Sequence, residues 1–114
     1  MPDATVPVLK GTLDVLVLKA LTWQPMHGFG IAVWLEQRSG GVLGIEDSAL
    51  YQALQRLEDR GLLDAEWRLS ENNRRARYYR LTAAGRKQLR AQTTSWLRYA
   101  GAVAQILQAS PRTA

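Results

Sequence analysis

The spacing of apolar residues changes near the middle of this chain, and the change limits the folds available to it. Before Gly61, apolar residues mostly recur every three or four positions, as on amphipathic helices. In residues 62–69 they alternate with charged residues, and residues 77–82 alternate again, as in strands with one buried face. The polar loop SENNRRA separates these two runs, so the pattern predicts a β-hairpin that follows helices.

Helical spacing predicts three helices before the hairpin. The first covers residues 9–23, and the second follows a Pro/Gly turn and ends near Gly40. A short strand is expected at 42–45. Polar residues at 46–48 can cap the third helix, which ends at Gly61, a residue suited to the left-handed position after a helix.

A fourth helix is predicted after the hairpin. Thr82 can cap it, and it runs from Ala83 to about Gln108. At ~1.5 Å per residue it reaches about 39 Å, which is more than a small domain covers with its own core. Apolar residues recur along it at intervals of three and four, a spacing typical of a seam between two chains. The predicted dimer interface consists of Leu89, Trp96, Ala100, Val103 and Leu107.

Composition excludes several classes of function. The 114 residues include one histidine and no cysteine, which excludes disulfides, thiolate chemistry and multi-histidine metal sites. No catalytic arrangement or cofactor motif stands out, so we expect neither an enzyme nor a cofactor. His27, in the Pro/Gly turn, is expected to make a structural hydrogen bond. The longest apolar stretch, 12–21, is too short to span a membrane and the N-terminus is unlike a secretory signal, which predicts a cytoplasmic protein.

Positive charge is concentrated in one segment. The net charge is +5, but residues 68–90 hold eight basic side chains and one acidic side chain, a local charge of +7. The remainder therefore carries −2. A basic segment on a near-neutral body indicates a polyanionic partner, and double-stranded DNA is the first candidate. The segment has no exposed apolar helix face, which disfavours a membrane as that partner.

The order of the predicted elements defines the fold class. Helix, helix, short strand, helix, strand, arginine-rich turn and strand are the elements of a winged helix-turn-helix. The chain is therefore expected to be mainly α with a small β-hairpin and a long C-terminal helix. We expect a flexible N-terminus at 1–8, a DNA-binding domain at 9–82, a dimerisation helix at 83–109 and a tail at 110–114.

The third helix is the candidate recognition helix. Its apolar residues Leu50, Ala53, Leu54 and Leu57 fall on one face, which leaves the opposite face for DNA. That face offers a hydroxyl for phosphate, amides for adenine and a guanidinium for guanine or phosphate. The predicted contacts are Ser48, Ala49, Tyr51, Gln52, Gln55 and Arg56. A solvated helix face is the alternative, although an exposed tyrosine argues against it.

The hairpin tip is the second candidate contact with DNA. Asn73, Arg74, Arg75 and Arg77 carry donors that suit phosphate oxygens and a narrow minor groove. A solubilising turn is the alternative. It needs only one or two polar residues, whereas four arginines lie between positions 74 and 80.

The four tryptophans divide into two expected roles. Trp23 and Trp67 fall on predicted inner faces and are expected in the core. Trp34 lies near the outer face of the second helix and Trp96 lies on the dimer seam. Aromatic planes that face each other across a dimer can hold a flat apolar effector, with plain interface packing as the alternative.

Four stretches of the chain resemble a known family. GTLDVLVLKAL, PMHGFGI, DSALYQALQRLEDRGLL and RRARYYRLTAAGRKQL are similar, in this order and spacing, to stretches of PadR-type bacterial transcriptional regulators. The similarity covers about residues 9–107, and the single C-terminal helix resembles the minimal branch of the family. It implies a dimeric winged-helix repressor that binds a palindromic operator and is often released by a small aromatic or hydrophobic effector.

The resemblance also implies roles for individual residues. The SLY-type recognition motif of the family matches Ser48, Leu50 and Tyr51, with Ser48 and Tyr51 on DNA and Leu50 in the core. Members frequently carry proline after the tyrosine, whereas this chain has Gln52, which adds a polar contact. We therefore expect a homodimeric, sequence-specific DNA-binding regulator. A winged-helix module that binds an acidic protein and a ligand-sensing dimer that does not act mainly on DNA are the open alternatives.

Overall fold

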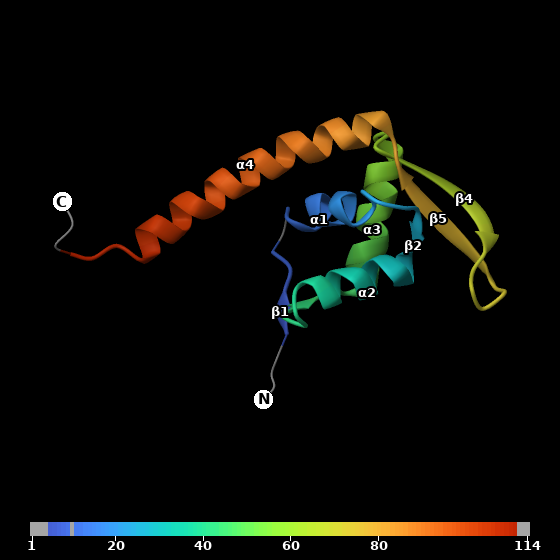
Figure 1. The fold of residues 1–114 in the computed structure, drawn as a ribbon, viewed down its shortest axis with the longest axis horizontal. Helices are drawn as coiled ribbons and strands as arrows, with labels where there is room; N and C mark the ends of the chain where they lie inside the picture. Colours follow the sequence, from blue (N-terminus) through green and yellow to red (C-terminus); the bar gives the residue numbers. More distant parts are fainter. Residues whose placement is uncertain (1–4, 10, 112–114) are drawn as a thin grey trace.

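The computed structural model of the chain describes residues 5–9 and 11–111. Helices form most of it, and short strands and one hairpin complete it (Figure 1). In chain order the elements are β1 (Val6–Pro7), α1 (Leu13–Ala20), β2 (Met26–His27), α2 (Gly28–Arg38), β3 (Leu43–Gly44), α3 (Asp47–Asp59), β4 (Leu63–Leu69), β5 (Arg75–Leu81) and α4 (Ala83–Leu107).

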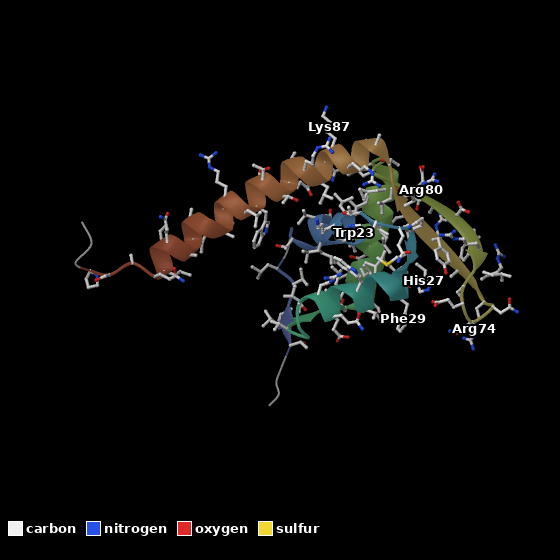
Figure 2. All side chains as sticks on the ribbon, viewed as in Figure 1. Trp23, His27, Phe29, Arg74, Arg80 and Lys87 are labelled. Carbon is white, nitrogen blue, oxygen red and sulfur yellow. The ribbon has the colours of Figure 1, made fainter. Side chains whose placement is uncertain are left out.

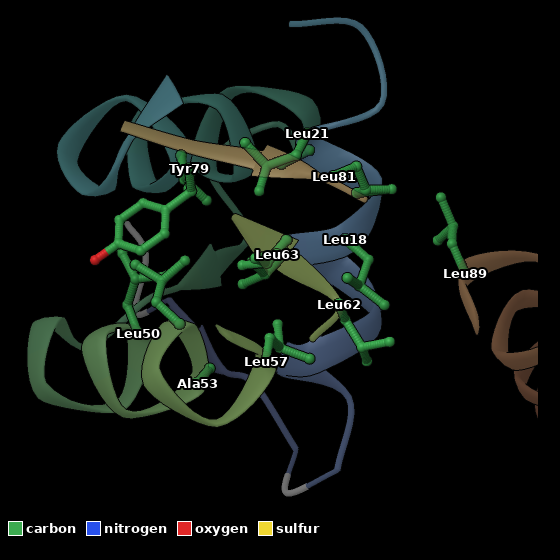
Figure 3. Close-up of a cluster of buried hydrophobic side chains, with 14 of the residues drawn as sticks. Leu18, Leu21, Leu50, Ala53, Leu57, Leu62, Leu63, Tyr79, Leu81 and Leu89 are labelled. Carbon is green, nitrogen blue, oxygen red and sulfur yellow. The ribbon is translucent and has the colours of Figure 1, made fainter. Parts of the chain in front are cut away.

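One apolar core joins helices α1, α2 and α3 to the hairpin and to the start of α4 (Figure 3). The face of α3 that the spacing predicts to be apolar is buried, which confirms that prediction. Complete burial of one large apolar side chain contributes about 1.5–3 kcal/mol, so this shared core holds the elements together. Its buried members outside α3 are Val17, Leu18, Ala20, Leu21, Ile31, Leu35, Leu62, Leu63, Tyr79, Leu81 and Leu89.

Local backbone chemistry sets the direction in which α4 leaves the rest of the fold. Gly61 takes a φ of +74° and its N–H bonds the carbonyl of Glu58 at 2.9 Å, which ends α3 as predicted. Thr82 caps α4 as predicted, because its Oγ1 accepts the N–H of Gly85 at 3.0 Å. The same hydroxyl donates to the carbonyl of Gly61 at 2.8 Å. The end of α3 is thus bonded directly to the start of α4.

The hairpin forms the wing of the fold. β4 and β5 are antiparallel, with Leu63 opposite Leu81 and Leu69 opposite Arg75. β2 adds a strand to the other edge of β5, and β1 pairs in parallel with β3. β1 and β2 are absent from the sequence-based prediction, because two residues are too few to show a period, and β1 lies in the segment predicted to be flexible. The predicted fold class, a winged helix-turn-helix with a long C-terminal helix, is confirmed.

Three expectations about apolar residues and helix ends are wrong. α1 covers Leu13–Ala20 and not 9–23, because Gly11 has a φ of +89°, which a right-handed helix does not use. Trp23 follows α1 and is 64% exposed. Trp67 is 55% exposed, because the hairpin extends beyond the core and its inner face is covered only near Leu63.

α4 projects far from the other elements (Figure 1). The described part measures 60 × 38 × 22 Å, and its radius of gyration is 16.5 Å, against about 13 Å for a compact chain of this length. Among the described residues, no helix is both long and apolar enough to cross a membrane. Residues 1–4 of the predicted flexible N-terminus and 112–114 of the predicted tail lie outside the described part.

Candidate nucleic-acid interface

α3 presents a polar face opposite its buried face. Tyr51, Gln52, Gln55 and Arg56 are exposed on it, as is Ser48 in the first turn, while Ala49 is half-buried. The N-cap of the helix is Glu46, whose side chain does not bond the backbone N–H groups of the first turn. Ser48 instead donates its hydroxyl to Glu46 Oε1 at 2.6 Å. The N–H groups of this first turn therefore receive no side-chain cap from Glu46.

Two of the α3 side chains predicted to contact DNA are bonded to carboxylates of the same chain. Arg56 Nη2 lies 2.7 Å from Asp14 Oδ1 on α1, and Gln55 Nε2 donates to Asp59 Oδ1 at 2.8 Å. Both arrangements are exposed, so a DNA phosphate or base edge can compete with them. The sequence pattern did not reveal the Arg56 pair because its partners are 42 residues apart.

Tyr51 packs against the start of α2. A Cβ atom at Gly28 would lie 2.7 Å from the Tyr51 hydroxyl oxygen, so the absence of a side chain at Gly28 makes room for the tyrosine. His27 caps α2 in the same place, with Nδ1 accepting the N–H of Gly30 at 3.0 Å, which confirms its predicted structural role. The Tyr51 phenol on α3 and the start of α2 therefore form one continuous surface.

The tip of the wing is a tight turn that exposes its donors. Asn73 has a φ of +61°, a conformation that asparagine tolerates, and its N–H bonds the carbonyl of Ser70 at 2.9 Å. Arg74 projects from this turn (Figure 2). Arg75 and Arg77 belong to β5 and not to the turn itself, which places them beside Trp67 on β4.

Trp67 makes cation–π contacts with two arginines of the wing. The guanidinium of Arg75 lies 4.9 Å from the centre of its ring, and that of Arg77 lies 5.8 Å away. Such contacts contribute about 0.5–1 kcal/mol at exposed sites and hold the cations in place. Trp67, which was expected in the core, thus lies exposed beside the arginines of the candidate interface. A cavity of about 430 Å³ between α2, α3 and the wing is lined by Tyr51, Trp67, Arg74, Arg75 and Arg77, among others.

Arg77 forms an ion pair with α3. Its Nη2 donates to Glu58 Oε2 at 2.6 Å, and both side chains are partly buried. Two positions further along β5, burial raises the pKa of the Tyr79 phenol, while the nearby Arg77 charge works in the opposite direction. Tyr79 therefore stays neutral beside the ion pair. No spacing rule for helices or strands reveals a pair between these two elements.

The outer face of the hairpin also carries arginines, but they have partners there. Arg80 Nη2 lies 3.0 Å from Asp64 Oδ2, and Arg68 stacks over Tyr78 at 4.0 Å. Of the predicted wing contacts, Arg74 and Arg75 are exposed, and no ion pair to either is found among the described residues. The wing thus offers these two guanidinium groups to a partner on the side of α3.

α4 places the predicted dimer residues in different surroundings. Leu89 lies in the core of its own chain, so its assignment to the dimer seam is corrected (Figure 3). Trp96 donates its Nε1 hydrogen to Thr12 Oγ1 at 3.3 Å. Ala100 and Val103 are half-buried, and Leu107 is 79% exposed. The sequence pattern missed other exposed apolar side chains on this helix, namely Leu97, Tyr99 and Ile106.

The two tryptophans expected to contact an effector lie in separate places. Trp34 is half-buried against the core, and its ring centre lies 5.7 Å from that of Trp23. Trp96 lines a cavity of about 660 Å³ between α1 and α4, together with Thr12, Val15, Gln92 and Tyr99. Trp34 is not part of the lining of that cavity.

Comparison with known proteins gives a family match over most of the fold. The model of the PadR-like transcriptional regulator family matches residues 17–91. A PadR family transcriptional regulator from Eggerthella lenta is 32% identical, with a TM-score of 0.73 and coverage of 89% of this chain and 86% of that chain.

Two further solved structures share the fold. A transcriptional regulator from Clostridium thermocellum is 23% identical, with a TM-score of 0.78 and coverage of 87% of this chain and 93% of that one. PadR of Bacillus subtilis, solved in complex with operator DNA, is 21% identical, with a TM-score of 0.63. That match covers 71% of this chain and 47% of the Bacillus chain, so this chain corresponds to about half of it.

Proposed function

The chain belongs to the PadR-like family of transcriptional regulators, and from this premise we propose that it is a homodimeric repressor that binds a palindromic operator. The family consists of DNA-binding regulators and not of enzymes. The observation that carries the proposal is the placement of the polar face of α3 beside the arginines of the wing. The Bacillus subtilis relative with the same fold binds operator DNA, which supports this use of the surface.

The proposed roles follow from the groups that each element exposes. On α3, Ser48, Tyr51 and Gln52 have side chains that reach base edges or phosphates, and Ala49 lets the helix approach the groove closely. On the wing, Asn73, Arg74 and Arg75 contact phosphates beside the site that α3 reads. Gln55, Arg56 and Arg77 are bonded to carboxylates in the free chain, so a contact with DNA requires those bonds to open.

We propose that α4 joins two copies of the chain. Its outer half carries exposed Leu97, Tyr99, Ile106 and Leu107, which a monomer leaves in water. A twofold dimer places its recognition helices about one helical turn of DNA apart, roughly 34 Å, and this spacing makes the operator palindromic.

The cavity beside Trp96 supports release by a small hydrophobic or aromatic effector. Its volume of about 660 Å³ lies in the range of ligand sites, and Trp96 and Tyr99 supply aromatic surface. The hydrogen bond from Trp96 to Thr12 links α4 to the residue that precedes α1. A ligand stacked on Trp96 would disturb this link and so change the position of the DNA-binding elements relative to α4.

Selection and competition on duplex DNA test the proposal. The purified full chain selects duplexes from a random pool about 30 base pairs long, which is enough for two half-sites. Fluorescence anisotropy then compares the most enriched duplex, called the selected duplex below, with its scrambled version at two salt concentrations. We expect a palindrome that binds at least about a hundredfold more tightly than the scrambled duplex. Equal affinity for both duplexes contradicts specific recognition, and no binding at low salt favours a protein-interaction module.

A further inference from the structure

The ion pair between Arg77 and Glu58 differs from the other ion pairs of the described residues in the elements that it joins. Among ion pairs of the described residues, Arg56–Asp14 joins α3 to α1, and Arg80–Asp64 lies within the hairpin. Arg77–Glu58 joins the recognition helix to the wing. Its N–O distance is 2.6 Å, and the two side chains are 36% and 26% exposed. It is therefore more sheltered than the Arg80 pair, whose side chains are about 60% exposed.

β2 holds β5 at Tyr78 and Tyr79, but this pairing does not extend to the outer half of the wing. Apolar cover on its inner face ends near Ala65, and Trp67 and Leu69 are exposed. Arg77 lies directly opposite Trp67 in the hairpin register and stacks near its ring. The ion pair thus fixes the wing at the point where the hydrophobic core stops supporting it.

We propose that Glu58 is a positioning residue for DNA recognition. It holds Arg77, and through Arg77 the wing, at a fixed angle to α3. Arg74 and Arg75 then reach the DNA backbone in register with the side chains of α3 on the bases. A wing that is already ordered avoids the entropic cost of being ordered on the DNA. This inference rests on the proposed function, and it assigns Arg77 to the support of the wing and not to phosphate.

The two roles of Arg77 predict opposite results when Glu58 is neutralised. If Arg77 were a phosphate contact, Glu58 would compete with DNA for it, and its loss would strengthen binding to every sequence. The slope of log K against log salt would then steepen by about one phosphate contact. If Glu58 positions the wing, its loss weakens binding to the selected duplex and leaves binding to the scrambled duplex nearly unchanged.

The test compares Glu58→Gln with Asp64→Asn in the full chain. Both substitutions remove one negative charge and release one wing arginine, but Asp64 lies on the outer face of the hairpin. We expect Glu58→Gln to lower affinity for the selected duplex about tenfold, with less than about a twofold change for the scrambled duplex. Asp64→Asn should show no such selective loss. Stronger binding by Glu58→Gln, or an equal loss on both duplexes, overturns the inference.

A charge reversal provides the second readout. The double variant Glu58→Arg with Arg77→Glu rebuilds the ion pair but removes the guanidinium from position 77. We expect it to recover preference for the selected duplex relative to Glu58→Gln and to Arg77→Glu alone. A double variant that stays as poor as the single variants overturns the inference. Wild-type protein without any sequence preference contradicts the proposed function itself, so the two failures are distinguishable.

Discussion

At the scale of single residues, the effect of a substitution on this fold depends on which atoms surround the position. Gly28 and Gly85 illustrate this, since both are buried glycines next to other elements. A Cβ atom at Gly28 meets the movable end of the Tyr51 side chain, whereas a Cβ atom at Gly85 would overlap the carbonyl oxygen of Leu62. The contact at Gly85 involves backbone, which cannot move aside without shifting the connection between α3 and β4. Gly85 therefore controls how closely α4 approaches the backbone at Leu62.

Gly85→Ala should destabilise the protein by about 1–3 kcal/mol, because the new methyl group overpacks a backbone contact. Denaturant unfolding followed by circular dichroism measures this as a lower midpoint. Gly101→Ala is the matched control, since Gly101 lies on the same helix with no atom within 4 Å of its added Cβ. That variant should gain about 0.5–1 kcal/mol from helix propensity. A neutral Gly85→Ala would contradict the close approach of α4.

At the scale of elements, the wing is an extension of a helical core. Its base is buried through Leu63, Tyr79 and Leu81, while its outer half is held by stacking on Trp67 and by the ion pair of Arg77 with α3. This division explains why an alternating strand pattern can carry an exposed tryptophan on its inner face. Alternation identifies the two faces of a strand, but the extent of the core determines how much of the inner face is covered.

Replacement of both exposed wing arginines should weaken DNA binding without regard to sequence. Arg74→Ala with Arg75→Ala removes two cations that lack ion-pair partners within the described chain. The slope of log K against log salt should become shallower by about 1.8, which corresponds to two phosphate contacts on duplex DNA. Anisotropy titrations at several salt concentrations measure it. Arg98→Ala, which removes one cation from an exposed position on α4, is the control for loss of charge away from the wing. An unchanged slope in the wing variant would exclude the wing from the contact.

At the scale of the whole molecule, α4 is longer than the part of it that the core covers. Its first two turns pack on the core through Gly85 and Leu89, and Trp96 makes a last hydrogen bond to Thr12. Beyond that point the helix projects with exposed apolar side chains, and the radius of gyration of 16.5 Å reflects this projection. Such a surface is typical of an interface between subunits.

Charges at the end of α4 should separate the proposed dimer without unfolding the monomer. Ile106 and Leu107 are 75% and 79% exposed, so Ile106→Glu with Leu107→Glu leaves the core intact. Sedimentation equilibrium should show a monomer, while circular dichroism stays close to wild type and operator affinity falls at least about tenfold because one half-site is lost. Gln105→Glu with Gln108→Glu adds the same charge on polar positions as a control. A doubly charged Ile106/Leu107 variant that remains dimeric would place the interface elsewhere.

The sequence by itself determined the four helices, the hairpin and their order, because helix period, strand alternation and capping are local properties. The apolar spacing around Leu50 and Leu57, the cap at Thr82 and the left-handed Gly61 all have causes within a few residues, and each was predictable. Only the tertiary structure decided which apolar side chains are covered and which charges are paired. Leu89 entered the core, Trp67 was left outside it, and Glu58 met Arg77 across 19 residues of chain. These outcomes depend on where separate elements meet in space, which no local period records.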